Sequence, residues 1–277
     1  MNPPADHGRD GATPRGGVRL NKLLAERVGL ARRKCDEAIL AGLVTVDGAA
    51  VTTPGLVLDP AAHAIAFRGH ALPAAPEFHH LAFHKPLGVL VTWSDPRGRP
   101  TVRDFVPQGL PRLFAVGRLD ADTSGLLLLT NDGALAHRLA HPRYEVAKTY
   151  LLAVDAPPTR AQLAALRRGV DLGDGESSGP ARAVTVDEEW GSGAVLRLVI
   201  AEGKNRQVRR MCEAVGLPLS GLCRVAFGPL ALGDLPVGAT RPLERDEIRA
   251  LRASARDPEP PVRGRTGRSP APARRPR

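Results

Sequence analysis

The chain has 277 residues, 43% of them hydrophobic, which is enough to bury one large core and one small one. Its formal net charge of +10 favours a polyanionic partner, most simply nucleic acid. The apolar run of four leucines, 126–129, is far too short to span a bilayer, and the first thirty residues lack the apolar stretch of a signal peptide. We therefore expect a soluble, cytoplasmic protein.

The positive charge is unevenly distributed along the chain. Residues 251–277 contain eight arginines against two acidic residues, so the first 250 residues account for only +4 of the +10. The three cysteines, Cys35, Cys212 and Cys223, form no CxxC pair and have no histidines at zinc spacing. The sequence thus predicts reduced core cysteines, a basic tail and no metal site.

The first 77 residues predict a disordered start followed by a small domain. Residues 1–17 are rich in Gly and Pro and without periodicity. From residue 18, Leu20, Leu23, Leu24 and Val28 recur at helical spacing, and "ARRKCDEAILAGL" (31–43) predicts a second helix. The next stretch, "VTVDGAAV" (44–51), carries the Asp-Gly pair of a hairpin. We place this domain at residues 18–77, with 70–80 as a linker.

Short apolar strands separated by Gly, Pro and Asp turns dominate residues 78–250. Six segments predict strands: 81–93, 112–120, 125–130, 148–155, 181–190 and 194–203. Three segments predict helices: 134–142, 159–170 and 206–217. With few parallel crossover units, this mixture predicts an α+β domain with a mixed, largely antiparallel sheet. The Arg- and Pro-rich residues 251–277 predict a disordered tail that tethers RNA.

Two short motifs resemble catalytic signatures without the context that those signatures need. Residues 175–179, "GESSG", match the G-x-S-x-G hydrolase pattern, which requires a strand before it and a helix after it. Here a strand beginning near Pro180 follows, so a polar hairpin loop is the better interpretation. Asp122-Thr123-Ser124-Gly125 is similar to the aspartic-protease turn, but no second copy supplies the partner carboxylate.

A basic cluster opens the predicted helix near residue 206. Lys204, Arg206, Arg209 and Arg210 lie there, and a solvated basic face is the default interpretation of such a run. However, a helix N-terminus already carries partial positive charge, so cations gathered there favour a nearby anion. That anion is either RNA phosphate or a carboxylate of the chain, for which Asp120 is the natural candidate.

Taken together, the motifs resemble those of a known family. "RLNKLLAERVGLARRKCDEAILAGLVTVDG" is similar to an S4 RNA-binding domain. "KPLGVLVTWSDPRGRPTVRDFVP", "VGRLDADTSGLLLLTNDG" and "EGKNRQVRRMCEAVG" are similar, in the usual order, to motifs of bacterial ribosomal RNA pseudouridine synthases that carry an S4 domain. The resemblance covers roughly residues 18–250 and implies an isomerase without a cofactor or metal.

The resemblance also implies roles for individual residues. Asp120 matches the catalytic aspartate, which acts either as a nucleophile at C1′ or as a base at C2′. Arg209 matches the basic residue that pairs with this aspartate and keeps it charged. Tyr150 matches the active-site tyrosine, although a buried strand residue is its default interpretation. Arg118 matches the residue that fills the space left by the extruded base.

Phosphate contacts are expected from a wider set of cations: Arg19, Lys22, Arg32, Arg33, Lys204, Arg206 and Arg210. The partner implied is ribosomal RNA or a ribosomal subunit precursor, bound by a monomer. Large-subunit rRNA is the preferred substrate and small-subunit rRNA the alternative. Two rivals stay open at this point: a non-catalytic S4-type assembly factor and a hydrolase that uses Ser177.

Overall fold

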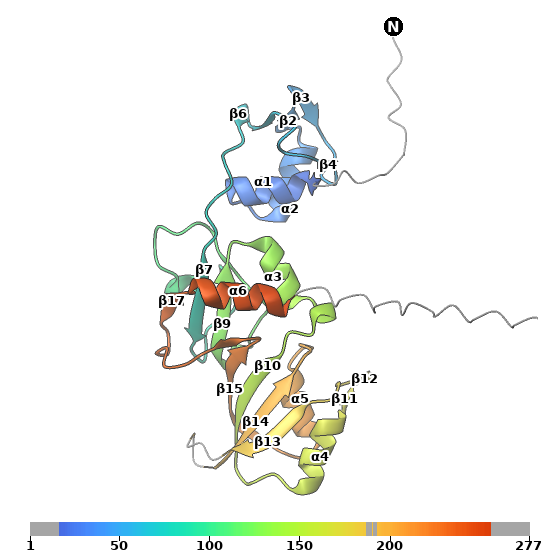
Figure 1. Ribbon diagram of the computed structural model, residues 1–277, viewed down its shortest axis with the longest axis vertical. Coiled ribbons are helices and arrows are strands. Elements are labelled where there is room, and N and C mark those ends of the chain that lie inside the picture. Colours follow the sequence, from blue (N-terminus) through green and yellow to red (C-terminus); the bar gives the residue numbers. More distant parts are fainter. Residues whose placement is uncertain (1–16, 187–189, 191–192, 256–277) are drawn as a thin grey trace, which may run out of the picture.

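The computed structural model describes residues 17–186, 190 and 193–255 of the chain. These residues form an elongated molecule, with a small N-terminal unit at one end and a long sheet flanked by helices through the rest (Figure 1). The predictions for residues 1–16 and 256–277 lie outside the described residues.

The N-terminal unit packs two helices, α1 (Leu20–Val28) and α2 (Arg32–Leu40), against two small sheets. One sheet pairs β1 (Val18–Arg19) with β4 (Val57–Leu58). The other has the strand order β3-β2-β5-β6, with β2 (Val44–Val46), β3 (Ala49–Val51), β5 (Ile65–Phe67) and β6 (His70–Ala71). Asp47 and Gly48 both have positive φ, 51° and 82°, as the tight turn between β2 and β3 requires. The predicted hairpin is therefore confirmed.

A large sheet with strand order β13-β14-β10-β15-β9-β7-β17 forms the second domain. Its strands are β7 (His80–Lys85), β9 (Ser124–Thr130), β10 (Lys148–Val154), β13 (Arg182–Val186), β14 (Ala194–Ile200), β15 (Leu219–Phe227) and β17 (Thr240–Pro242). Two short strands, β8 (Phe114–Ala115) and β16 (Leu230–Ala231), pair with β9 and β15. Every pairing is antiparallel except β15 with β9, which confirms the α+β class with a largely antiparallel sheet.

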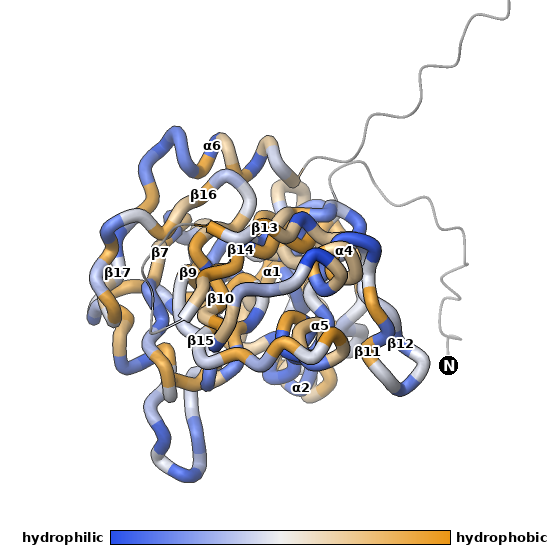
Figure 2. The backbone as a smooth tube through the Cα atoms, turned by 90° about the horizontal axis from the view of Figure 1, so that it is seen from below, coloured by the Kyte–Doolittle hydropathy of each residue, from blue (hydrophilic) through white to orange (hydrophobic). Residues whose placement is uncertain are grey.

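The four consecutive leucines of β9 are explained by cores on both faces of the sheet. Leu127 and Leu129 belong to one core, and Leu126 and Leu128 belong to the other. Because successive side chains of a strand point to opposite faces, a strand covered on both sides reads as an unbroken apolar run. Figure 2 shows this concentration of apolar residues along the strands at the centre of the molecule.

Four helices of the described residues cover the large sheet. The helices α3 (Gly133–Ala140) and α6 (Arg245–Ser254) contribute buried residues to the core with Leu126. The helices α4 (Arg160–Arg168) and α5 (Gln207–Ala214) contribute to the core with Leu127. The hairpin of β11 (Asp171–Gly173) and β12 (Glu176–Ser177) contacts α5.

Several elements differ from the sequence prediction. The long strands expected at 81–93 and 112–120 shorten to β7 and β8, because turns follow Lys85 and precede Asp120. The strand β15 was not predicted, although it lies between β10 and β9 at the centre of the sheet. The helix α6 extends past the predicted tail boundary at residue 251, since the Leu251 side chain is completely buried in the core.

Within the described part of the chain, we find no helix that combines the length and the apolar character needed to cross a membrane.

Candidate active site

A cavity of about 400 Å³ opens between the loop before β9, the strands β10 and β15, and the start of α5. It is lined by six of the residues singled out from the sequence: Arg118, Asp120, Tyr150, Lys204, Arg206 and Arg209. Their positions span just over ninety residues of sequence, so only the fold brings them together.

Asp120 occupies a tight turn at the edge of this cavity. The backbone carbonyl of Asp120 accepts a hydrogen bond of 3.1 Å from the amide of Thr123, which closes the turn. The amide of Gly88 donates to the carbonyl of Ala121 at 2.7 Å and ties the turn to the loop after β7. The half-buried Asp120 therefore sits on backbone that is fixed at two points.

A buried lysine lies near the same turn. The Lys85 ammonium donates hydrogen bonds to the carbonyls of Pro86 (2.8 Å) and Val89 (2.9 Å). Burial lowers the pKa of Lys85 to about 8, while the charges of Asp122 and Asp120 act in the opposite direction. The Lys85 ammonium is therefore close enough to both carboxylates for their negative charges to stabilise its protonated form.

Asp122, and not Asp120, is the carboxylate that pairs with the basic start of α5. Its carboxylate lies 3.0 Å from Nη2 of Arg206 and 3.2 Å from Nε of Arg209. Burial acts to raise the pKa of Asp122, but the hydrogen bond from Arg206 and the charge of Arg209 outweigh it and lower that pKa. This corrects the expectation that Arg209 pairs with Asp120. The partial positive charge of the helix N-terminus favours the carboxylate that faces it, which is Asp122.

Hydrogen bonds hold the loop before α5 in a fixed shape. Arg206 has a left-handed backbone, with φ 46° and ψ 31°, and offers no side-chain cap. The Gln207 side chain instead accepts from the amide of Lys204 at 2.9 Å and donates to Glu202. The Glu202 carboxylate also accepts from the amide of Gly179 at 2.6 Å. The loop that carries Lys204 and Arg206 is thus anchored to the chain near β12.

Arg210, expected among the RNA-binding residues, does not line the cavity. Its guanidinium donates to the carbonyl of Leu172 at 3.0 Å and to the Glu176 carboxylate at 2.6 Å. These contacts hold the β11–β12 hairpin against α5. One turn of helix separates the hairpin-facing Arg210 from Arg206, which faces the cavity.

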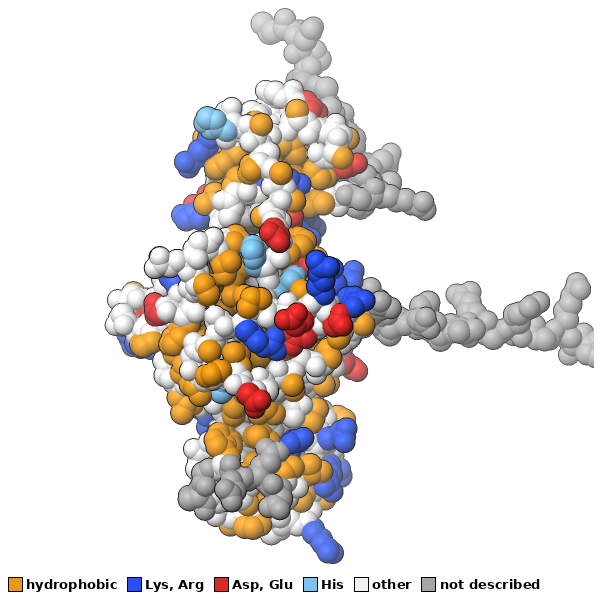
Figure 3. All heavy atoms as spheres, turned by 60° about the vertical axis from the view of Figure 1, so that its left-hand side comes forward, with side chains coloured by type: hydrophobic (Ala, Val, Ile, Leu, Met, Phe, Trp, Pro, Cys, Tyr) orange, Lys and Arg blue, Asp and Glu red, His pale blue; other side chains and the backbone are white. Residues whose placement is uncertain are grey.

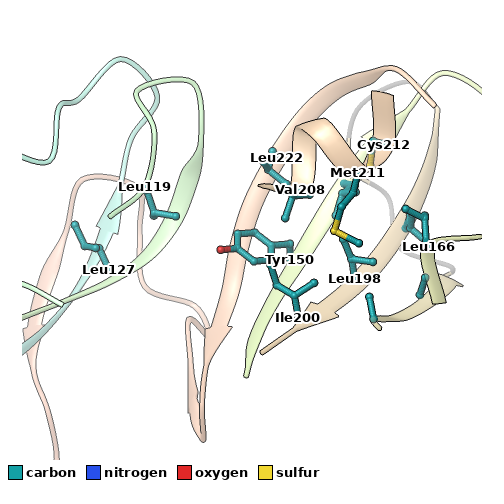
Figure 4. Packing of buried hydrophobic residues seen from close by; sticks show 14 of the residues in the cluster. Leu119, Leu127, Tyr150, Leu166, Leu198, Ile200, Val208, Met211, Cys212 and Leu222 are labelled. Carbon is teal, nitrogen blue, oxygen red and sulfur yellow. The ribbon is translucent and has the colours of Figure 1, made fainter. Parts of the chain in front are cut away.

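Tyr150 fits both interpretations of its role. It is only 8% exposed and belongs to the core, yet it lines the cavity. Its ring lies among Leu222, Val208 and Ile200, and its hydroxyl group points away from them toward the side of Leu119 (Figure 4). The sheet therefore fixes the ring on one side and leaves its other end to the cavity.

Sequence reasoning missed Arg224 and gave no separate role to Lys148, both of which line the cavity. Arg224 is on β15, paired across the strands with Tyr150, and its Nε donates to the carbonyl of Leu126 at 2.8 Å. The Lys148 ammonium donates to the carbonyls of Val146 (2.9 Å) and Ala201 (3.2 Å). The available signal for Arg224 is a cation inside an otherwise apolar run, "GLCRVAF".

The cations expected on the N-terminal unit lie outside this cavity. Arg19 and Arg33 are exposed, whereas Lys22 and Arg32 line a second cavity of about 720 Å³ that also includes His137 of α3. On the face drawn in Figure 3, basic side chains are interspersed with acidic ones along the molecule and do not form one continuous patch.

The "GESSG" segment has the structure expected of a hairpin loop. It forms the turn and second strand of β11–β12, and the strand β13 follows. The helix that a nucleophilic serine elbow needs is therefore missing after Ser177 in the described chain. Nor do the described residues contain a group of three or more His, Cys, Asp or Glu side chains arranged to hold a metal ion.

Comparisons with known proteins agree with this architecture. A family model described as RNA pseudouridylate synthase matches residues 79–214, and one described as S4 domain matches residues 18–62. An uncharacterized RNA pseudouridine synthase of Mycobacterium leprae is 44% identical, with 85% of this chain and 93% of the relative covered. The ribosomal large subunit pseudouridine synthase B of Bacillus subtilis is 39% identical, with 86% and 96% covered. The corresponding protein of Salmonella typhimurium is 40% identical, with 84% and 82% covered.

A solved structure described as a crystal structure of pseudouridylate synthase is 34% identical, with a TM-score of 0.60, and covers 84% of this chain and 99% of that chain. The fold and the cavity thus define an RNA-modifying isomerase preceded by an S4 RNA-binding domain. The chain belongs to the RNA pseudouridine synthase family.

Proposed function

We propose that this protein converts one specific uridine of large-subunit ribosomal RNA to pseudouridine, with Asp120 as the reactive carboxylate. The observation that carries the proposal is the gathering of Asp120, Tyr150, Arg206 and Arg209 around one cavity of about 400 Å³. The choice of ribosomal RNA is supported by the relatives of Bacillus subtilis and Salmonella typhimurium, which are named large subunit synthases.

The reaction requires the target base to leave its stack. Extruding a nucleotide costs a few kcal/mol, which contacts in the pocket must offset. Tyr150 supplies an aromatic surface for the extruded uracil, and Arg118, exposed at the rim, fills the space that the base leaves in the RNA. Asp120 then attacks C1′ or removes the C2′ proton, and the C1′–N1 bond breaks. After the uracil turns, its C5 forms the new bond to C1′.

Two arginines at the start of α5 contribute to this chemistry indirectly. Arg206 and Arg209 both bind Asp122, two residues from Asp120 in the same turn. They therefore orient the turn that carries the reactive carboxylate, and they leave the Asp120 side chain available to the substrate. The same two cations add positive charge at the cavity, where RNA phosphates approach.

The N-terminal unit supplies further phosphate contacts in this proposal. Arg19, Lys22, Arg32 and Arg33 position the RNA and make its binding sensitive to salt, but they carry little sequence information. Folded rRNA shape, contacted by both domains, selects the target. Action in the cytoplasm as a monomer, on rRNA or a subunit precursor, belongs to the same proposal.

A tritium-release assay on rRNA labelled at C5 of uridine tests the proposal. The C5 proton leaves only when the new bond forms there, so release reports the complete reaction. We expect Asp120→Asn to abolish release, and Asp234→Asn, which changes an exposed loop carboxylate, to leave it intact. Release by Asp120→Asn at the wild-type rate would refute the role of Asp120.

The assay also separates the remaining rivals. A wild-type protein that binds rRNA but releases no tritium would support the assembly-factor alternative. Loss of release in Ser177→Ala would revive the hydrolase-like role of that loop. Mapping pseudouridines in rRNA from a deletion strain then identifies the uridine, and a missing modification in small-subunit rRNA would overturn the choice of subunit.

A further inference from the structure

Arg224 is a buried cation whose charge has no acidic partner in the described chain. It is only 2% exposed, and just one of its nitrogens, Nε, donates a hydrogen bond, to the carbonyl of Leu126. Its Nη2 is buried without any partner. A buried guanidinium is normally paired with a carboxylate, because removing a charge from water is costly.

The surroundings of Arg224 increase this imbalance. Arg224 and Lys148 both lie against the ring of Phe227, at 5.1 Å and 5.8 Å from its centroid. The two cations are close enough for the charge of Arg224 to help lower the pKa of Lys148, after the larger effect of burial. Glu202 is the carboxylate that opposes this shift, but it is already bound to Gly179 and Gln207.

The backbone of Arg224 lies very close to that of β9. Its backbone approaches Gly125 so closely that a Cβ on Gly125 would lie 2.3 Å from the Arg224 carbonyl oxygen. The same strand register places Arg224 directly across from Tyr150, on the same face of the sheet. Both residues line one cavity, so a base that stacks on the Tyr150 ring enters the cavity that Arg224 lines.

A second orphan polar group occurs in the same cavity. The Thr123 hydroxyl is buried and has no hydrogen-bond partner, and Thr123 lines the cavity together with Arg224. Buried polar groups are nearly always satisfied in native proteins. Nε of Arg209 is a third, because it lies 3.2 Å from the Asp122 carboxylate but makes no hydrogen bond. Three unsatisfied groups in one cavity indicate a ligand that is rich in hydrogen-bonding oxygens.

We propose that Arg224 binds the uracil ring of the everted nucleotide and stabilises the negative charge that develops on it when the glycosidic bond breaks. This inference rests on the proposed function. It assigns to β15 a group that contacts the reacting base, while Asp120 acts on the sugar.

The electron balance explains why a cation is needed there. When the C1′–N1 bond breaks, its electron pair leaves with the uracil and spreads over N1, O2 and O4. On the ribose side there are two routes. Asp120 either bonds to C1′ in place of N1, or takes the C2′ proton, and only in this second route does a C1′=C2′ double bond form. In the return step C5 bonds to C1′, Asp120 is released or returns its proton to C2′, and the C5 proton leaves to solvent. Both routes pass through the same uracil anion, so the role of Arg224 holds for either.

The test compares leaving groups of different stability. The substrate is an RNA hairpin around the mapped uridine, with either uridine or 5-fluorouridine at that position. Fluorine withdraws electrons, so 5-fluorouracil leaves with less help from the protein. Consumption of the starting nucleoside is followed in single turnover by chromatography after digestion of the RNA. The variants are Arg224→Met, Arg224→Lys and, as a matched control, Arg167→Met. Arg167 lies on α4, and its guanidinium donates only to the carbonyl of Ala183.

We expect Arg224→Met to slow the uridine reaction about 10²–10³-fold, the loss typical of removing one donor to a developing anion. The loss with 5-fluorouridine should be clearly smaller, Arg224→Lys should fall between, and Arg167→Met should match the wild type. The ratio of the two rates within one preparation does not depend on the fraction that is folded. Equal losses on both substrates would overturn the proposal, whereas an inactive wild type would instead overturn the proposed function.

Discussion

Replacing Gly125 with alanine should weaken the connection between the two halves of the large sheet. One half contains β13, β14 and β10, the other contains β9, β7 and β17, and β15 joins them. The contact between β15 and β9 consists of two residue pairs, Cys223 with Ser124 and Arg224 with Gly125. An alanine at position 125 alters one of these two pairs directly.

The magnitude follows from the geometry at Gly125. Its φ is +108°, and an added Cβ would lie 2.3 Å from the carbonyl oxygen and 2.5 Å from the amide nitrogen of Arg224. Both atoms are backbone, so the strands themselves must move. A left-handed conformation costs an L-residue about 1–2 kcal/mol, and forcing extra atoms into a packed site costs about 1–3 kcal/mol. We expect a total loss of about 2–5 kcal/mol, a large part of the about 5–15 kcal/mol that stabilises a typical domain.

Gly109→Ala is the matched control, because Gly109 also has a positive φ, +83°, but an added Cβ there meets no atom within 4 Å. It should cost only the conformational part, about 1–2 kcal/mol. Urea unfolding followed by tryptophan fluorescence measures both variants, and the two tryptophans, Trp93 and Trp190, report on the second domain alone. A Gly125→Ala variant no less stable than Gly109→Ala would refute the steric argument.

Three further predictions concern charged groups. Asp122→Asn removes the carboxylate shared by Arg206 and Arg209. Because the Asp122 side chain is 47% exposed, the free energy of unfolding should fall by only about 0.2–1 kcal/mol. The rate of tritium release should fall much further, and unchanged release would contradict the orienting role. Burial and the neighbouring Arg224 lower the pKa of Lys148 to about 8, so the wild-type rate of tritium release should decline as pH rises through about 8. The Lys148→Arg variant stays charged and should keep its rate, whereas coincident pH profiles of the two proteins would show that this charge is unimportant. Arg241 lowers the pKa of Glu247, so their ion pair stabilises the fold above the ordinary glutamate pKa, and this stability is lost as pH falls. In urea unfolding, Glu247→Gln should be less stable than the wild type by about 0.2–1 kcal/mol at neutral pH and equally stable in acid. A difference that persists in acid would exclude the ion pair as its cause.

The elements that could be predicted from sequence are those with a strong local signal. The helices α1 and α2, the hairpin at Asp47 and Gly48, and the strand through Leu126–Leu129 each follow from a short pattern of spacing or turn chemistry. The strand β15 lacks such a pattern, because its register is set by partners about a hundred residues away in sequence. Arg224 was missed for the same reason.

The candidate site was predictable in its members but not in its pairings. Asp120, Tyr150 and Arg209 line one cavity, as the family resemblance implied. Which aspartate receives the arginines depends on how the turn at 120–123 faces α5, and nothing in the spacing of Asp120 and Asp122 decides that. Arg210 was likewise predicted to bind RNA because it belongs to the basic cluster, but its position on α5 directs its side chain to the β11–β12 hairpin.

The position of β15 along the chain has a consequence for biosynthesis. The N-terminal unit is complete once its last strand, ending at Ala71, has left the ribosome, and it can begin to fold while the remainder is still being made. The strands on either side of β15 cannot form one continuous sheet until residues 219–227 emerge and pair with both β10 and β9. A nascent chain thus completes its S4 domain early and its active-site cavity, which β15 helps to line, almost last. A prematurely terminated product would then contain the S4 domain without a complete active site.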